Sequence, residues 1–293
     1  MTEMNRREFL SRSTMAGAAA VAGSAAELHG REASVLAPAA FRFGLVTYLW
    51  GQDWDLETLV RNCEKTGYWG VELRTQHKHG VDDHLDKKQR AAVKKRFADT
   101  KVELVGLGCN WAFHDKDPAR LKANIEGAKR YVKLCHDVGG GGVKVKPNDL
   151  PKGVPFEKTV EQIGGSLNEV GKFAADYKCE IRVEVHGRCS ELPTMKAIFD
   201  HVTEPNVGVC WNCNATDLKG KGLEHNFNLV KARFGRTAHV RELDDKGYPY
   251  RQLMNLFRKA GWKGWVLLEA RGRPKDRIAA LRRQMELFRK MTT

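Results

Sequence analysis

The chain of 293 residues carries 50 Lys and Arg against 36 Asp and Glu, which gives a formal net charge of +14, and 42% of its residues are hydrophobic. This length suits one large α/β domain, and no apolar run of about 18 residues follows the N-terminal segment, so we expect no membrane span. The basic excess would suit nucleic acid or an anionic substrate. However, Lys and Arg gather in stretches of helical period such as 87–96 and 277–290, which indicates solvated helix faces.

The N-terminal segment differs in composition from the rest of the chain. Paired arginines, Arg6 and Arg7, precede a stretch of small apolar residues at 15–26. This pattern is typical of a twin-arginine export signal, and the stretch is too rich in Ala and Gly to pack as an amphipathic helix. We therefore predict a signal segment over 1–26, an N-terminal tether over 27–40, a barrel over 41–293 and a periplasmic or otherwise extracytoplasmic location.

From residue 41 onward, short β-branched runs alternate with segments of helical period. Eight such pairs occur, which favours a closed parallel barrel over an open sheet, and no G-x-G-x-x-G follows the first strand. The sequence therefore predicts an α/β fold, a single (β/α)8 TIM barrel. The predicted strands are 41–48, 70–74, 103–109, 142–146, 180–186, 207–212, 237–242 and 265–270, and the predicted helices lie at about 55–66, 86–99, 118–138, 156–178, 192–202, 223–234, 249–260 and 275–291.

The seven cysteines show no disulfide framework, and an odd number of thiols cannot all pair within the chain. Cys210 and Cys213 form a C-x-x-C motif without a second pair. The motif continues a strand, where residues three apart face opposite sides of the sheet. We therefore expect mostly buried thiols and no zinc knuckle.

Unusual polar residues stand near the carboxyl ends of the predicted strands, which form the catalytic mouth of such barrels. A carboxylate inside an apolar strand is costly to bury unless a cation or hydrogen bonds compensate it. A lone Glu or His on a strand is usually an ion-pair partner or a core group, but candidates on four successive strands favour a site. Their oxygen and nitrogen atoms would suit Mn²⁺, Mg²⁺ or Zn²⁺. These four candidates are Glu184, Asn212, His239 and Glu269.

With these motifs, residues 41–291 resemble the xylose isomerase-like barrel superfamily, in particular the sugar phosphate isomerase/epimerase group, which includes ketose 3-epimerases and inosose dehydratases. The resemblance implies that these four residues bind one divalent metal and that Glu184 and Glu269 act as acid and base. It also implies substrate-binding roles for His186 and Arg241. We further expect specificity residues at the mouth, namely Glu72, Trp111, His114 and Lys146. For Glu72, an ion pair at the barrel lip is an equal interpretation. For Lys146, a solvated strand end is the favoured interpretation.

One position departs from the family pattern, because Asn212 stands where the metal-binding residue is usually Asp. An amide oxygen can bind a hard cation but brings one negative charge fewer, so metal affinity should fall. Asp217, in the following loop, is a candidate for a compensating carboxylate.

The resemblance implies a divalent-metal-dependent sugar isomerase or epimerase that moves a proton α to a carbonyl through a metal-stabilised enediolate. The same residues would also serve a metal-dependent lyase or dehydratase acting on an oxidised sugar or glycoside. Asn212 keeps open a third interpretation, a barrel that binds carbohydrate without catalysis. An abasic-site endonuclease of the same superfamily would need a three-metal cluster, and the strand ends offer only about half its ligands. We therefore expect a carbohydrate partner and no nucleic acid, and we leave a homo-oligomer open.

Overall fold

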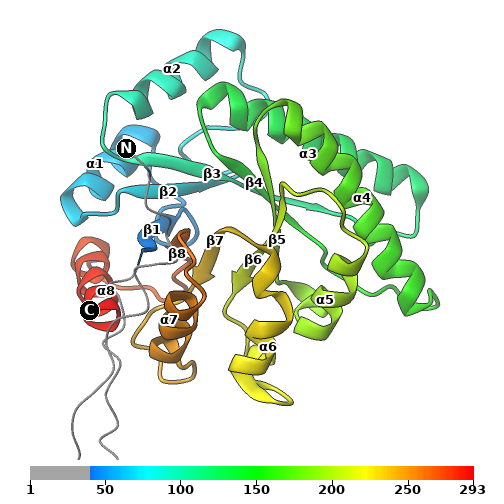
Figure 1. The fold of residues 1–293 in the computed structure, drawn as a ribbon. Helices are drawn as coiled ribbons and strands as arrows, with labels where there is room; N and C mark the ends of the chain where they lie inside the picture. Colours follow the sequence, from blue (N-terminus) through cyan, green and yellow to red (C-terminus); the bar gives the residue numbers. More distant parts are fainter. Residues whose placement is uncertain (1–39) are drawn as a thin grey trace, which may run out of the picture. The chain divides into compact units, whose positions relative to one another are not determined.

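The computed structural model describes residues 40–293, and the predicted signal at 1–26 and all but the last residue of the predicted tether at 27–40 lie outside the described residues. Eight parallel strands close into a barrel in chain order, and β1 pairs with both β2 and β8 (Figure 1). This confirms the predicted (β/α)8 barrel. The strands are β1 Arg42–Val46, β2 Gly70–Arg74, β3 Glu103–Ala112, β4 Gly142–Lys146, β5 Glu180–Glu184, β6 Val207–Asn212, β7 Phe234–Val240 and β8 Trp265–Leu268.

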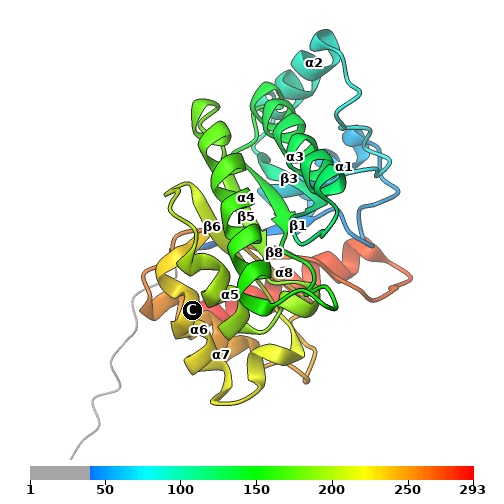
Figure 2. The same ribbon diagram turned by 90° about the vertical axis from the view of Figure 1, so that its right-hand side faces the viewer.

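A helix follows each strand and covers the outside of the barrel. Figure 2 shows α3, α4 and α5 side by side along the face of the barrel turned toward the viewer, and neighbouring helices of this group pack against each other. None of the helices in the described part of the chain is long and apolar enough to cross a membrane. The helices are α1 Leu56–Thr66, α2 Lys87–Ala98, α3 Pro118–Val138, α4 Phe156–Asp176, α5 Leu192–Asp200, α6 Gly222–Val230, α7 Tyr250–Lys259 and α8 Arg277–Thr292.

Local signals in the sequence fix where several helices begin and end. Asp55 caps α1 by accepting a hydrogen bond from the Thr58 amide at 2.7 Å, and Gly67 ends that helix in the left-handed conformation. Asp86 and Gln89 form a reciprocal capping box at the start of α2. These caps satisfy amide groups that the first turn of a helix leaves without partners, and they fix the residues at which α1 and α2 begin.

The lower part of the barrel interior is closed by two large side chains. Trp265 is 2% exposed and lies under the guanidinium of Arg42, 3.9 Å from the ring centroid. Arg182 is equally buried; it donates to the Val105 carbonyl at 2.9 Å and to Glu180 at 2.6 Å. The interior is therefore filled below the carboxyl ends of the strands, and an opening remains only toward the mouth.

All seven cysteines are buried free thiols, as the sequence predicts. Two strands extend beyond their predicted bounds, because β3 runs on to Ala112 and β7 already begins at Phe234. Four strands, β1, β5, β7 and β8, end two residues earlier than predicted. Both extensions accompany register shifts against a neighbouring strand, between Gly108 and Ala112 in β3 and between Val209 and Trp211 in β6. Alternation of apolar residues alone does not reveal such irregularities.

Candidate active site

The deepest polar pair of the site joins opposite sides of the barrel. Glu72 on β2 and His239 on β7 are both fully buried, and Nε2 of His239 lies 3.2 Å from Oε1 of Glu72. The two groups form an ion pair, but the ring N–H is not aligned for a hydrogen bond. Burial opposes ionisation of Glu72, but the positive charges of His239, Lys144 and Arg182 together outweigh burial, so the pKa of Glu72 falls below its usual value. Glu72 is thus an interior ion-pair partner and not the mouth residue that the sequence suggested.

Glu184, at the end of β5, accepts hydrogen bonds on both carboxylate oxygens. Lys144 on β4 donates from Nζ to Oε2 at 2.6 Å, and Asn212 on β6 donates from Nδ2 to Oε1 at 3.0 Å. Lys144, Glu184 and Asn212 are each 2% exposed. Burial alone would raise the pKa of Glu184, but the positive charges around it, Lys144 first and then His239 and Lys146, together outweigh burial and lower that pKa to about 2. Glu184 is therefore a fixed, ionised carboxylate.

Glu269 directly follows β8, and its backbone amide donates to the Val240 carbonyl at 2.7 Å. Its side chain is 8% exposed and has no hydrogen-bond donor among residues 40–293. Burial, and after it the negative charge of Glu184, raises the pKa of Glu269 above its usual value. The two carboxyl groups of the site therefore have pKa values that their surroundings push in opposite directions.

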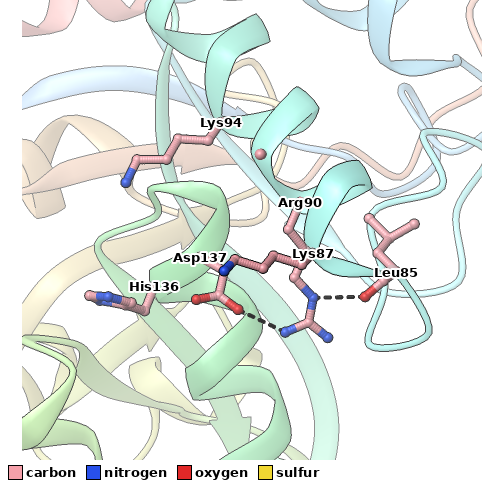
Figure 3. Close-up of a pocket in the computed structure, with 7 residues that line it drawn as sticks. Leu85, Lys87, Arg90, Lys94, His136 and Asp137 are labelled. Carbon is pink, nitrogen blue, oxygen red and sulfur yellow. Dashed lines mark hydrogen bonds and ion pairs between the residues drawn. The ribbon is translucent and has the colours of Figure 1, made fainter.

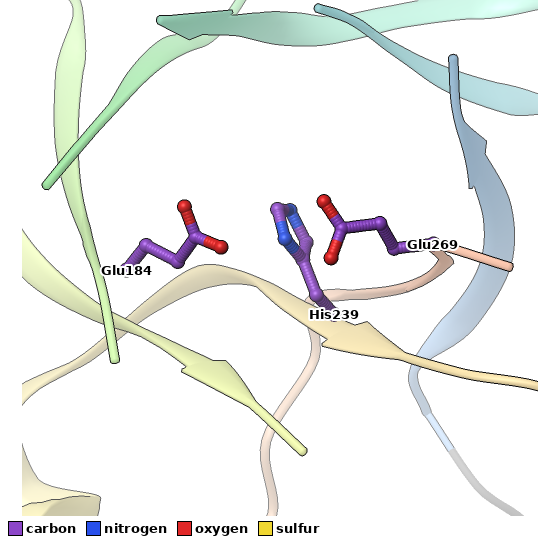
Figure 4. Close-up of side chains that lie close together, drawn as sticks. All are labelled: Glu184, His239 and Glu269. Carbon is purple, nitrogen blue, oxygen red and sulfur yellow. The ribbon is translucent and has the colours of Figure 1, made fainter. Parts of the chain in front are cut away.

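The side chains of Glu184, His239 and Glu269 point toward one another inside the barrel (Figure 4). One ligand atom from each lies within 4.8 Å of the others, which makes the three residues a candidate metal-binding group. The structure thus brings together three of the four residues that the sequence suggested as ligands. The fourth, Asn212, contacts this group through its amide nitrogen, the atom of the side chain that cannot bind a cation.

A cavity of about 120 Å³ opens above this group at the mouth of the barrel. Two of the predicted substrate-binding residues, His186 and Lys146, lie in its wall. The ring of His186 is held by a 2.7 Å contact between Nδ1 and Oδ1 of Asn148. The lining is almost entirely polar or charged and consists of Tyr48, Arg74, Lys144, Lys146, Glu184, His186, Glu269 and Arg271.

Three other predicted mouth residues do not line this cavity. The indole of Trp111 packs against α3, where a Cβ on Gly127 would lie only 2.4 Å from it, so the prediction that Trp111 faces the mouth is wrong. The register shift after Gly108 accounts for this orientation. His114 lies half-buried beyond β3, and Arg241 is half-buried just after β7, where its backbone amide donates to the Tyr250 hydroxyl oxygen at 3.2 Å.

Asp217 does not join the site as a replacement carboxylate. It is fully buried near the 3₁₀ turn after β6, where Oδ2 accepts hydrogen bonds from the Tyr248 hydroxyl at 2.7 Å and from the Asn214 amide at 3.0 Å. Burial raises the pKa of Asp217 to about 7. The carboxylate therefore has a structural setting away from Glu184 and Glu269.

Sequence reasoning missed Lys144, the residue that most changes the chemistry of the site. The signal was present, because Lys144 and Lys146 alternate with valines in β4 and must share one face of the strand. Lys146 was predicted as a mouth residue because it ends the strand. Lys144, which lies one layer deeper in the barrel, was not considered. Tyr48, Arg74 and Arg271, which stand at or just after the ends of strands, were missed as well.

Another surface pocket, larger than the barrel cavity, lies between α2 and α3 (Figure 3). It has a volume of about 530 Å³, and Arg90 pairs across it with Asp137 at 2.9 Å. The remaining charged groups are lysines and a histidine on exposed helix faces, without a buried acid or base. We therefore place the chemistry in the smaller barrel cavity, because the buried ionisable groups converge there.

A family model described as "Xylose isomerase-like TIM barrel" matches residues 60–291. The chain belongs to this family. No curated protein matches the chain. Among solved structures, the chain is similar to the apo form of 3-keto-D-glucoside 4-epimerase from E. coli, with a TM-score of 0.71 and 15% identity over 85% of this chain and 99% of that one.

Two further structures show the same relationship. L-ribulose 3-epimerase has a TM-score of 0.72 at 14% identity, over 86% of this chain and 94% of the other. The IOLI protein with a bound zinc atom has a TM-score of 0.72 at 16% identity, over 86% and 98%. At these identities the likeness supports a shared fold, while the chemistry of this chain has to be argued from its own side chains.

Proposed function

We propose that this protein is an enzyme, a sugar isomerase or epimerase that moves a proton on the carbon next to a carbonyl. The observation that carries the proposal is the pair of buried carboxyl groups, Glu184 and Glu269, which face one cavity and have pKa values shifted in opposite directions. Such a pair is the usual arrangement for a base and an acid working at one pH. The similar structures include two sugar epimerases, which favours a carbohydrate substrate.

In the proposed reaction, Glu184 is the base because it is held ionised, and it takes the α proton of a keto-sugar. The electron pair of the broken C–H bond moves to the carbonyl oxygen and forms an enediolate. Glu269, the group with the raised pKa, returns a proton to the opposite face of the same carbon for epimerisation. For isomerisation it returns the proton to the neighbouring carbon, and the hydroxyl proton of the enediolate passes from one oxygen to the other. Lys146 and His186, in the cavity wall, are placed to bind substrate hydroxyl groups.

The family implies a divalent metal at this place, and the side chains fit such an ion poorly. Glu184, His239 and Glu269 are close enough together. However, both oxygens of Glu184 already accept hydrogen bonds, and the Lys144 ammonium stands 2.6 Å from one of them. The loss of one negative charge, or the gain of one positive charge, about 5 Å from a divalent ion weakens its binding by several kcal/mol at an effective dielectric constant of about 20. The metal therefore stays a prediction, and the reaction is written with the groups of this chain.

Deuterium exchange tests the proposed proton transfer without knowledge of the final product. The purified chain is incubated with keto-sugars in D₂O, and loss of the α-proton signal is followed by NMR together with the products. We expect exchange that falls by about 10²–10⁴-fold in Glu184→Gln and in Glu269→Gln. Glu157→Gln, on the exposed first turn of α4, is the matched control and should exchange at the rate of the original protein.

Two outcomes would change the assignment. If Glu184→Gln and Glu269→Gln exchange as fast as the original chain, these carboxyl groups are not the acid and base. If the product has lost water or an aglycone, the enediolate is followed by β-elimination, and the protein is a lyase with the same proton-transfer residues.

A further inference from the structure

We propose that Lys144 is the resident cation of this site and takes the electrostatic place of the divalent ion that the family would bind. The inference rests on the proposed function and names the group that faces the developing enediolate oxygen. Lys144 is 2% exposed, yet its side chain borders the mouth cavity together with Glu184 and Glu269. Within residues 40–293 it is the most deeply buried cation in the wall of that cavity.

The hydrogen bonds of Lys144 leave one donor for a substrate. An ammonium group has three N–H donors. One is given to Oε2 of Glu184 at 2.6 Å, and a second, longer contact of 3.4 Å reaches the Cys109 carbonyl. The backbone of Lys144 is fixed in β4, where its carbonyl accepts from the Cys109 thiol at 3.0 Å. The third donor can therefore meet a substrate oxygen in the cavity without moving the strand.

The charge on Lys144 also follows the electron pair during the reaction. Before proton transfer the negative charge lies on Glu184, which Lys144 contacts. After transfer Glu184 is neutral and the charge lies on the enediolate oxygen in the same cavity. A cation in reach of both positions stabilises the negative charge throughout the step. A metal ion stabilises the charge of an enolate in the same way.

A second observation points the same way. Asn212 removes one carboxylate from the metal-binding pattern, and its amide nitrogen donates to Glu184 at 3.0 Å. Lys144 adds one positive charge to the same carboxylate from the opposite neighbouring strand. Both changes make the site less suited to a divalent ion and leave Glu184 fully hydrogen-bonded. Two independent residues that alter the charge in one direction indicate a site that works without a tightly held metal.

Gly108, the residue before Cys109, makes room for Glu72 beside this lysine. A Cβ on Gly108 would lie only 2.9 Å from Oε1 of Glu72, whereas its distance of 3.4 Å to Cε of Lys144 would be an ordinary contact. The missing side chain at residue 108 therefore lets a buried glutamate and a buried lysine lie at the same level of the barrel.

Metal titration of the original protein tests the inference directly. The chain is treated with EDTA, dialysed and titrated with MnCl₂, while free Mn²⁺ is measured by EPR. We expect no stoichiometric binding below about 1 mM. The double variant Asn212→Asp/Lys144→Met restores the carboxylate and removes the ammonium, and it should bind one Mn²⁺ at least about 100-fold more tightly. One Mn²⁺ bound by the original protein with micromolar affinity would overturn the proposal, whether or not the double variant folds.

Proton exchange gives a second, separate measurement. The EDTA-treated protein should exchange the α proton of its substrate at an unchanged rate, and Lys144→Met should lose about 100-fold or more. Lys172→Met, on the exposed face of α4, is the control and should keep the full rate. Exchange that stops with EDTA and returns with Mn²⁺ would overturn the role of Lys144 but leave the proposed isomerase standing. Absence of exchange under every condition would refute the isomerase, while the Mn²⁺ titration would still decide the cation.

Discussion

The buried carboxyl group of Asp217 should make the protein less stable as the pH rises. Burial raises its pKa to about 7 from 3.8, so between these values the folded chain keeps a proton that the unfolded chain has lost. A group whose pKa is raised on folding in this way favours the folded state only when it is protonated. The contribution of Asp217 to the free energy of unfolding is therefore largest below about pH 4. It declines as the pH rises toward 7 and is constant at higher pH.

The size of this effect follows from the shift in pKa. A difference of about three pKa units corresponds to about 4 kcal/mol, at about 1.4 kcal/mol for each unit. The hydrogen bonds from Tyr248 and Asn214, which support the ionised form, are already contained in this net shift. Asp217→Asn keeps an oxygen for those donors and cannot ionise, so we expect it to gain about 1–4 kcal/mol over the original protein at pH 8 and almost nothing at pH 4.

Urea unfolding of the two proteins between pH 4 and pH 8, followed by circular dichroism, measures this difference. The comparison matters because other carboxylates change the stability of both proteins equally. Asp176→Asn, at an exposed position in α4, should show no such pH-dependent gain. A stability difference for Asp217→Asn that is the same at pH 4.5 and pH 8 would refute the ionisation argument.

Two further substitutions test the packing on which the site depends. Glu72→Gln leaves His239 buried opposite a neutral amide and should destabilise the protein by about 3 kcal/mol, while Glu72→Gln/His239→Gln should recover part of this loss in urea unfolding. Asp86→Ala removes the capping box of α2 and should cost about 1 kcal/mol in the same assay without changing proton exchange, and an equal loss in Gln89→Ala would support the reciprocal bond.

The sequence predicted the scaffold well because a parallel barrel has a strict repeat. Each strand is buried on both faces and each helix on one, so the alternation of the two patterns is visible without tertiary information. The same regularity explains why Glu184, His239 and Glu269 could be predicted to meet: each stands at or near the carboxyl end of a strand, and these ends share one rim. Their chemical roles stay predictions.

The neighbours of these residues were harder to predict, because they depend on depth and on strand register. Trp111 stands at the carboxyl end of β3 and still turns toward α3, since the strand shifts register after Gly108. Glu72 lies at the level of His239 and pairs with it below the cavity. Neither the register shift nor the depth leaves a signal in the alternation of apolar and polar residues.

The arrangement of charge in the barrel interior itself argues for where the reaction takes place. Glu72 is compensated by His239, and Glu184 by Lys144. Glu269 is the remaining carboxyl group of this layer and has neither a cation nor a hydrogen-bond donor in contact among the described residues. Burying such a group costs free energy that the fold alone does not recover. The cost is explained if Glu269 serves a bound substrate, because an acid that already had a partner would not be free to exchange a proton with carbon.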